Sequence, residues 1–345
     1  SYSSDGEFHL HGPGQGTIFG PPVWLAVSSL ILDLVPIKAT PISFHSPDGE
    51  TIIQRYMDGY VDDTTGWTNT FTSSLINGTD SISIRNQLQA LAQWWEELLT
   101  TTGGKLELPK CFFYVVNFEF DTDGIPSLTT HPPDHPALNL HMKDSITGET
   151  VYINHYKPTT PHKTLGTHLS PDLSHHAELR YLISKAHSLC TRLLPHTLDQ
   201  ELIRRFLLTM CRPAICYSAP ISTLTEKEWR QVQRRLIGIT LQKLHCSHTT
   251  PQAIVHAPSH LGGLDIPDGF SEQGTQHTLL LLKHIRAKSV LGDHLRLVLQ
   301  WTHKLSGYHL PPLEEVATEM PHVFAPLAET TRIFLHESNC HLKRN

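Results

Sequence analysis

Residues 56–67 read YMDGYVDDTTGW, and this stretch restricts the possible folds more than any other part of the chain. β-branched and aromatic residues lie on both sides of a short polar tip, which is typical of a β-hairpin. Asp62 and Asp63 are adjacent at that tip, where a hairpin holds neighbouring side chains rigidly. Two carboxylates there make a concentrated negative site, and hard cations such as Mg²⁺ prefer oxygen ligands. The alternative is a solvated turn, because Asp is common in turns.

The charge of the chain is unevenly distributed. The 345 residues carry a net charge of −6 and are 39% apolar and 17% charged, which fits a soluble protein of two or three domains. Residues 1–173 hold 8 Lys or Arg and 19 Asp or Glu, residues 174–246 hold 11 and 5, and residues 247–345 hold 8 and 9. The middle segment is therefore basic within an otherwise acidic chain, an asymmetry that can mark an element that binds a polyanion.

Several elements are expected around the hairpin. A glycine-rich loop at residues 11–17 leads to Gly20-Pro21-Pro22 and an apolar helix, since proline is favoured at the first helical position. The turn at residues 47–49 predicts a hairpin directly before the carboxylate hairpin. The helical pattern of residues 81–102 ends at Gly103-Gly104 and is followed by a strand within residues 106–116. Residues 121–148 are expected to be a loop or an insertion.

The second half of the chain is expected to be mainly helical. It follows a hairpin formed by residues 150–154 and 163–169. Apolar periodicity predicts a helix over residues 174–194, and residues 197–200 and 225–228 each fit a capping box that opens a further helix. These helices carry five arginines that we interpret as contacts to a nucleic-acid backbone, with a solvated helix face as the alternative: Arg204, Arg205, Arg230, Arg234 and Arg235.

The sequence favours an intracellular protein, without distinguishing nucleus from cytoplasm. The six cysteines show no paired metal-ligand spacing and no disulfide framework, so we expect reduced thiols. No signal peptide is visible. The most apolar run, residues 23–37, contains Asp33, and we expect it to be too short to span a membrane.

In this order, the motifs resemble those of a reverse transcriptase of the non-LTR retroelement type, over the C-terminal part of its palm and its thumb. The resemblance rests on the Tyr60-Val61-Asp62-Asp63 box, on Gln15-Gly16 before a proline-started helix, on Lys110 before an aromatic strand, and on Leu165-Gly166. It implies an RNA-directed DNA polymerase that uses Mg²⁺, with Mn²⁺ as a substitute. It also implies an RNA template, a DNA primer and deoxynucleoside triphosphates as partners.

The resemblance also implies roles for single residues. Asp62 and Asp63 would hold the metal ions that assist nucleotidyl transfer onto the primer 3′ end. Lys110 would lie near the triphosphate, although a solvated lysine at the start of a strand is the alternative. Gln15, Gly16 and Tyr60 would bind substrate, with Gln15 beside the nascent base pair, and Leu165 and Gly166 would contact the primer end.

The expected fold class is α+β. A partial palm with an antiparallel sheet and packed helices is expected over residues 1–173, a helical thumb-like segment over residues 174–246, and a further helical region over residues 247–345. The family supplies another essential aspartate from a strand before the glycine loop, but Asp5 alone precedes that loop and lies in no strand-like run. We therefore expect the protein to begin upstream of Ser1 and this chain alone to be inactive.

Two other interpretations remain open. One is a retroelement relic that binds nucleic acid through its basic helices without catalysis. The other is an unrelated α+β protein in which the Asp-Asp pair is an ordinary turn.

Overall fold

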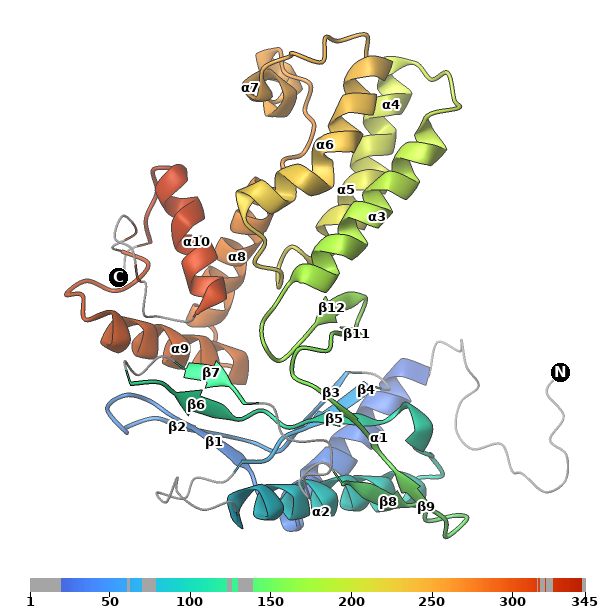
Figure 1. Ribbon diagram of the computed structural model, residues 1–345, viewed down its shortest axis with the longest axis vertical. Helices are drawn as coiled ribbons and strands as arrows, with labels where there is room; N and C mark the ends of the chain where they lie inside the picture. The colour runs from blue at the N-terminus through green and yellow to red at the C-terminus, as the bar shows by residue number, and fades with distance from the viewer. Residues whose placement is uncertain are drawn as a thin grey trace, which may run out of the picture. The chain divides into compact units, whose positions relative to one another are not determined.

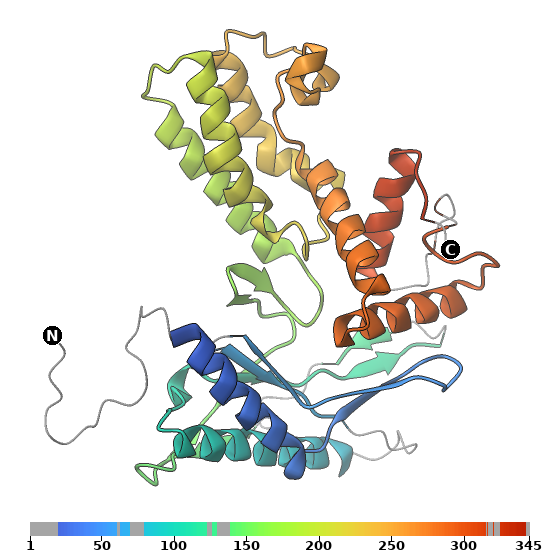
Figure 2. The same ribbon diagram turned by 180° about the vertical axis from the view of Figure 1, so that it is seen from behind.

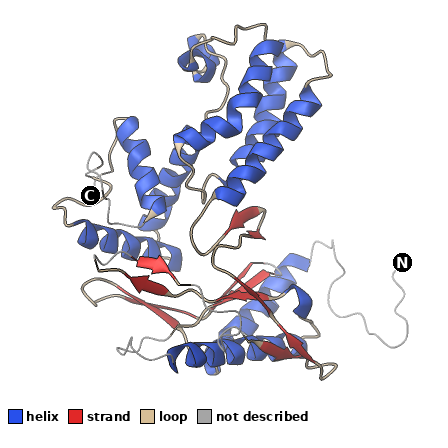
Figure 3. Ribbon diagram, viewed as in Figure 1, coloured by secondary structure: helices blue, strands red, loops and turns tan. Residues whose placement is uncertain are grey.

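The computed structural model describes residues 20–60, 63–69, 79–122, 126–129, 139–314, 316, 320 and 325–342. The chain divides into two compact units, one of residues 1–45 and 52–158 and the other of residues 46–51 and 159–345 (Figure 1). Coloured by secondary structure, the first unit combines short strands with helices, whereas the second is mainly helical (Figure 3). The protein is therefore of mixed helix and sheet, as the sequence predicts. The units separate at residue 158, earlier than the expected boundary at residue 173.

The first unit is built on two crossing helices (Figure 2). Helix α1 (Gly20–Leu34) continues as the 3-10 helix η1 (Val35–Ile37), and both pack against α2 (Thr79–Thr101). Pro21 and Pro22 lie in the first turn of α1, where an N–H group has no intrahelical partner. The shared core contains Ile31, Val35, Leu91, Trp95, Leu98 and Leu99.

We expected residues 23–37 to be too short to span a membrane, but the helical segment that contains them is longer than this run. The helical segment begins at Gly20 and takes in both prolines, so Gly20–Ile37 is long and apolar enough to cross a membrane by length and composition. It is the one such helix in the described part of the chain. One face of the segment is occupied, because Ile31 and Val35 are buried against α2. Core helices of soluble proteins pass the same test, so this property alone does not identify a membrane protein.

Two hairpins lie where the sequence predicts them. Strand β1 (Ile42–His45) pairs antiparallel with β2 (Ile52–Arg55), and β3 (Met57–Tyr60) pairs antiparallel with β4 (Asp63–Gly66). Gly66 is tightly enclosed, because a Cβ atom at this position would lie 2.9 Å from Cδ2 of Leu91 in α2. The close approach of strand and helix holds the β3–β4 hairpin against α2.

Side chains of α2 satisfy the backbone of a strand that the sequence did not predict. Strand β8 (His141–Lys143) pairs on one side with β9 (Thr150–Tyr152). On its other side Gln89 accepts from the N–H of His141 at 3.0 Å and donates to its carbonyl, and Gln93 makes the same two bonds with Lys143 at 2.8 and 3.0 Å. Glu96 accepts from the N–H of Ser145 at 3.1 Å. The match arises because four helical residues rise about 6 Å and two strand residues about 6.7 Å.

The described strands do not form the single antiparallel palm sheet that we expected. They form six separate two-stranded sheets, of which five are antiparallel and one, β5 (Phe112–Tyr114) with β10 (Asn154–Tyr156), is parallel. Strands β6 (Phe118–Phe120) and β7 (Pro126–Leu128) form another of these pairs. The expected pairing of residues 150–154 with 163–169 is wrong, because β11 (His162–Thr164) pairs with β12 (Thr167–Leu169).

The second unit has its core between long helices. Helix α3 (His176–Leu193) packs against α6 (Glu226–Lys243), and Leu182, Ala186 and Leu189 meet Trp229, Val232 and Leu236 there. Along the chain, α3 and α6 are separated by four short helical segments: α4 (Gln200–Phe206), the π-helix η4 (Leu207–Cys211), α5 (Arg212–Ile215) and the 3-10 helix η5 (Cys216–Ser218). The capping box of Thr225 and Glu228 is confirmed. Helix α4 is instead capped by Asp199, whose carboxylate accepts from the N–H of Leu202 at 2.8 Å.

The C-terminal helices add to this core and build a second one around Leu281, Leu295 and Leu335. They are α7 (Gln252–His256), the 3-10 helix η6 (Ser259–Leu261), α8 (Gly269–Arg286), α9 (Val290–Ser306) and α10 (Pro326–Glu337). Buried Gln273 of α8 accepts from Trp229 Nε1 at 3.0 Å and from the N–H of Leu224 at 3.1 Å, and donates to the carbonyl of Leu224 at 2.8 Å. Because Val255, Ile266 and Phe270 share a core with α3 and α6, the chain has no structural break at residue 246.

Candidate functional site

The β3–β4 hairpin presents the Tyr-Val-Asp-Asp stretch at the end of two paired strands. Tyr60, the last residue of β3, is paired with Asp63, the first residue of β4. Val61 and Asp62, the two residues of the sequence between these strands, lie outside the described residues. Tyr60 is 61% exposed and Asp63 is also exposed, so the described part of this hairpin end faces solvent.

The two carboxylates of the hairpin that the structure describes, Asp58 and Asp63, differ in whether a cation is paired with them. Asp58 of β3 forms an ion pair with Arg55, and the Arg55 guanidinium lies 5.6 Å from the ring centre of Trp67. The charge of Asp58 is thus largely compensated within the hairpin. Asp63 has no such ion pair in the described part of the chain, and its carboxylate is available to a cation from solvent.

The predicted metal site is placed only in part. Adjacent aspartates offer the oxygen donors that Mg²⁺ and Mn²⁺ prefer, so the donor chemistry fits these ions. Within the described ranges, no three His, Cys, Asp or Glu side chains form a group that could hold a metal ion. Asp63 is the one predicted ligand that the structure describes. Asp62, like Gln15 and Gly16 of the predicted substrate site, lies outside those ranges.

Lys110 ends a short 3-10 helix, η2 (Leu108–Lys110), directly before strand β5. Its N–H donates to the carbonyl of Glu107 at 2.8 Å, and Leu108 beside it is buried in a core with Phe113, Leu140 and Met142. The buried leucine fixes the backbone while the Lys110 side chain is exposed. This position suits both the solvated lysine and a lysine that meets an anionic ligand.

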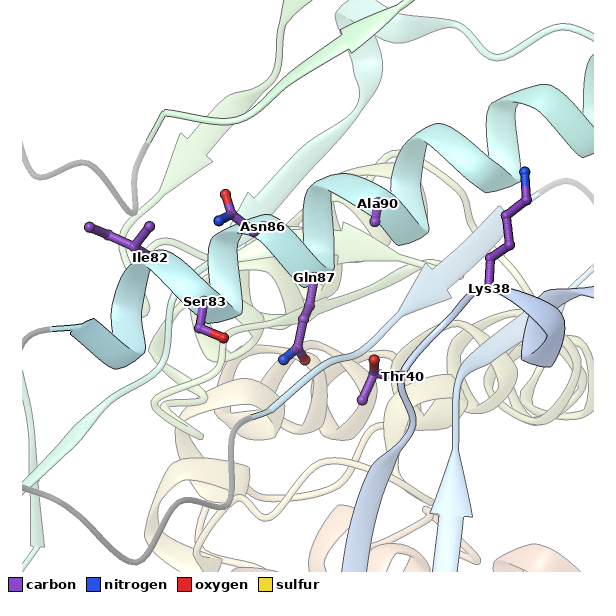
Figure 4. Close-up of a pocket in the computed structure, with 7 residues that line it drawn as sticks. All are labelled: Lys38, Thr40, Ile82, Ser83, Asn86, Gln87 and Ala90. Carbon is purple, nitrogen blue, oxygen red and sulfur yellow. The ribbon is translucent and has the colours of Figure 1, made fainter.

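A shallow hollow of about 440 Å³ lies along α2, lined by Lys38, Thr40, Ile82, Ser83, Asn86, Gln87 and Ala90. Figure 4 shows Thr40 and Gln87 on opposite sides of it. The ammonium of Lys38 lies 3.6 Å from the ring centre of Trp94 and 3.7 Å from a carboxylate oxygen of Glu97. These contacts hold the side chain in place and compensate its charge. The hollow therefore presents mainly neutral polar groups and none of the predicted site residues.

Leu165 and Gly166 form the turn of the β11–β12 hairpin, and both have positive φ angles, of 49° and 88°. This backbone conformation is costly for leucine, because its Cβ approaches the following carbonyl. The phenol of Tyr217 donates to the carbonyl of Leu165 at 2.9 Å. A Cβ on Gly166 would lie 3.1 Å from the Tyr217 ring. The turn is thus clamped by Tyr217 and exposes the apolar Leu165 side chain.

A buried glutamate attaches the same hairpin to α3. Glu178, 1% exposed, accepts from the N–H of His168 at 2.8 Å, and its Oε2 lies 3.2 Å from Nδ1 of the same histidine. Sequence reasoning missed both Glu178 and Tyr217. Glu178 precedes Leu182 by four residues and so falls on the apolar stripe of α3, where a carboxylate signals a specific partner. Tyr217 gave no such signal.

Helix α6 carries a one-sided row of cations. Trp229, Val232 and Leu236 bury one side of the helix, and the other side exposes Lys227, Arg230, Arg234 and Arg235. Arg230 forms an exposed ion pair with Glu226, one turn before it. Arg234 and Arg235 form no ion pair within the described part of the chain. The structure thus brings the three predicted arginines of α6 onto one exposed side.

The two arginines of α4 are less alike than predicted. Arg205 is exposed, whereas Arg204 is half-buried and its Nε atom is buried without a hydrogen-bond partner in the described structure. Only Arg205 is therefore fully available to an external phosphate.

No family model, curated protein or solved structure matches this chain. The residues of the site therefore have to be interpreted by their own geometry and chemistry.

Proposed function

We propose that this chain belongs to an RNA-directed DNA polymerase of the retroelement type, with the β3–β4 hairpin at its catalytic centre. The observation that carries the proposal is the pairing of Tyr60 with Asp63 at the solvent end of two short strands. This pairing leaves Val61 and Asp62 as the connection, so the Tyr-x-Asp-Asp box coincides with a hairpin end.

In this proposal the two carboxylates supply the negative charge that holds the catalytic ions. Two bound Mg²⁺ ions would stabilise the attacking and leaving oxygens of an in-line displacement at the primer 3′ end. Asp63 is exposed and free of an ion pair with Arg55, which is engaged by Asp58. Lys110, exposed before β5, is the proposed contact to the triphosphate. Leu165 and Gly166, held by Tyr217, are the proposed contact to the primer.

A second candidate function is nucleic-acid binding without catalysis. The exposed side of α6 favours it, because Lys227, Arg230, Arg234 and Arg235 lie together there and contacts of this kind neutralise phosphates regardless of sequence. This function needs neither Asp62 nor Asp63. The two candidates therefore differ in what a carboxylate substitution does.

The experiment is RNA-templated primer extension with Mg²⁺ and with Mn²⁺. It compares this chain, the protein translated from the whole reading frame, and the Asp62→Asn and Asp63→Asn variants of each. The polymerase proposal predicts that the protein from the whole reading frame extends the primer. Asp62→Asn should abolish this extension and Asp63→Asn should reduce it, because each change removes charge with little change in volume. Primer–template binding without any extension would leave the second candidate. Extension that is unchanged in Asp62→Asn would show that the hairpin is not the catalytic centre.

A further inference from the structure

Three polar side chains surround the ring of Tyr181 in the second unit. The ammonium of Lys163 lies 5.0 Å from the ring centre, the ammonium of Lys185 lies 5.3 Å from it, and the His168 ring centre lies 4.9 Å away. We call Lys163, His168, Tyr181 and Lys185 the Tyr181 cluster. Two cations thus converge on one aromatic ring.

The fold assembles this cluster from two elements. Lys163 of β11 and His168 of β12 are direct cross-strand partners, so their side chains share one face of the hairpin. The buried Glu178 binds His168 and so fixes this face against α3. Tyr181 and Lys185 are separated by one helical turn on α3 and are neighbours on its surface. The position of each member is therefore set by a strand register, a buried anchor or a helical repeat.

The charges in the cluster are not balanced by a carboxylate at the surface. Neither lysine forms an ion pair within the described part of the chain, unlike Lys38 with Glu97 and Lys105 with Asp144. Glu178, the carboxylate that anchors His168, is buried and engaged by that histidine. The aromatic face attracts an ammonium group by its quadrupole but leaves its positive charge uncompensated, and the group has three N–H donors to share. Lys163 is exposed and Lys185 half-buried, so donors remain for an external anion.

We infer that the Tyr181 cluster is a phosphate-binding site that takes the backbone phosphates of a nucleic acid. Lysine ammonium groups bind phosphate as point charges, and two of them pre-positioned on one ring lose little freedom on binding. The inference rests on the proposed nucleic-acid function and adds a contact surface to it, separate from the arginines of α6. Free polyphosphate, such as pyrophosphate or a nucleoside triphosphate, shares the same chemistry and is the other source to test.

The test measures binding of a fluorescent RNA–DNA hybrid at 50 to 200 mM salt. The variant K163A/K185A is compared with K283A/K288A, which removes the same charge from two exposed lysines at the end of α8 and beyond it. Loss of two phosphate contacts lowers the slope of log affinity against log salt by about 1.8. The wild type should therefore lose about 12-fold more affinity than K163A/K185A across this fourfold salt range. K283A/K288A should retain the wild-type slope.

Further arms separate the possible results. Tyr181→Phe keeps the ring and should bind like the wild type, whereas Tyr181→Leu should weaken binding. A cooperative thermal unfolding transition of Tyr181→Leu would show that this variant is still folded. Pyrophosphate that binds the wild type more tightly than K163A/K185A, while both proteins bind the hybrid with the same salt slope, would assign the site to free polyphosphate instead of a backbone. Equal salt slopes for wild type and K163A/K185A would overturn the inference. Hybrid binding that still depends on the α6 arginines would then leave the proposed function standing, and absence of all binding would overturn both.

Discussion

The phenol of Tyr217 donates a hydrogen bond of 2.9 Å to the backbone carbonyl of Leu165, 52 residues earlier in the chain. This bond holds a turn in which a leucine has a φ angle of 49°. A residue in this conformation is a sign of strain that the surrounding structure maintains, and such strain often serves function. The turn is therefore the place where a stabilising substitution should reveal a functional cost.

Leu165→Asn should raise the free energy of unfolding by about 1 kcal/mol, because asparagine tolerates positive φ better than leucine. The same change should weaken primer–template binding, since it removes the apolar side chain that the turn exposes. Leu173→Asn is the matched control, because Leu173 also has a positive φ, of 60°, and is 47% exposed. It should stabilise the protein and leave binding unchanged. Thermal unfolding and hybrid binding check both variants, and equal binding by all three proteins would contradict the assigned role of Leu165.

Glu178→Ala should destabilise the second unit by about 2 kcal/mol, because the part-buried N–H of His168 would lose its acceptor. Glu178→Gln retains an acceptor oxygen of similar size and should cost less than half as much. Urea unfolding gives both values. If alanine and glutamine lower the midpoint equally, the charge of Glu178 matters and its hydrogen bond to the backbone does not.

His277 of α8 should make stability depend on pH. Its side chain is fully buried, and burial lowers its pKa from 6.5 to about 4. The unfolded chain therefore binds more protons than the folded protein between these values, so the free energy of unfolding falls as the pH drops from 6.5 to 4. The histidine contributes about 3 kcal/mol to this fall. His277→Gln should remove that part of the dependence, and His187→Gln, at an exposed position of α3, should retain it. Identical pH profiles of the wild type and His277→Gln would contradict the assignment.

The arginines of α6 should govern the salt dependence of nucleic-acid binding. Replacing Arg230, Arg234 and Arg235 together by alanine should reduce the slope of log affinity against log salt by up to about three, near 0.9 for each phosphate contact. The loss should be similar for all sequences, because phosphate contacts carry no sequence information. The control K283A/R286A/K288A removes the same charge from the end of α8 and its vicinity. A slope that falls equally in both variants would indicate an effect of net charge alone.

The parts of the fold that the sequence predicted are those set by nearby residues. The β3–β4 hairpin follows from its polar tip between β-branched and aromatic residues, and α6 follows from the Thr225–Glu228 capping box and apolar periodicity. The mistaken cap of α4 differs from the true one by two residues, since Thr197 and Asp199 are both good capping residues. Local patterns of this kind are short-range and can be read along the chain.

The pairing of distant strands could not be predicted in the same way. Strand β8 lies within a segment rich in proline, histidine and aspartate that resembles a loop, and its stability depends on Gln89 and Gln93 of α2. The parallel pair β5–β10 joins residues about forty positions apart, which no local pattern specifies. Of the predicted site, exposure of Asp63 and the shared side of the α6 arginines follow from hairpin and helix geometry. The anchoring roles of Glu178 and Tyr217 depend on tertiary contacts.

The glutamine pairs along α2 have a consequence for association between copies of the protein. A strand with an open edge is a template for another chain, and amide side chains at both His141 and Lys143 occupy the groups that an incoming strand would use. Gln93 thus occupies the N–H and carbonyl of Lys143, which a strand of another molecule would otherwise bind. A leucine at this position would fill the same space and still leave the N–H and carbonyl of Lys143 ready to recruit a neighbouring molecule. The helix would then remain folded while the protein became prone to self-association that rises with concentration.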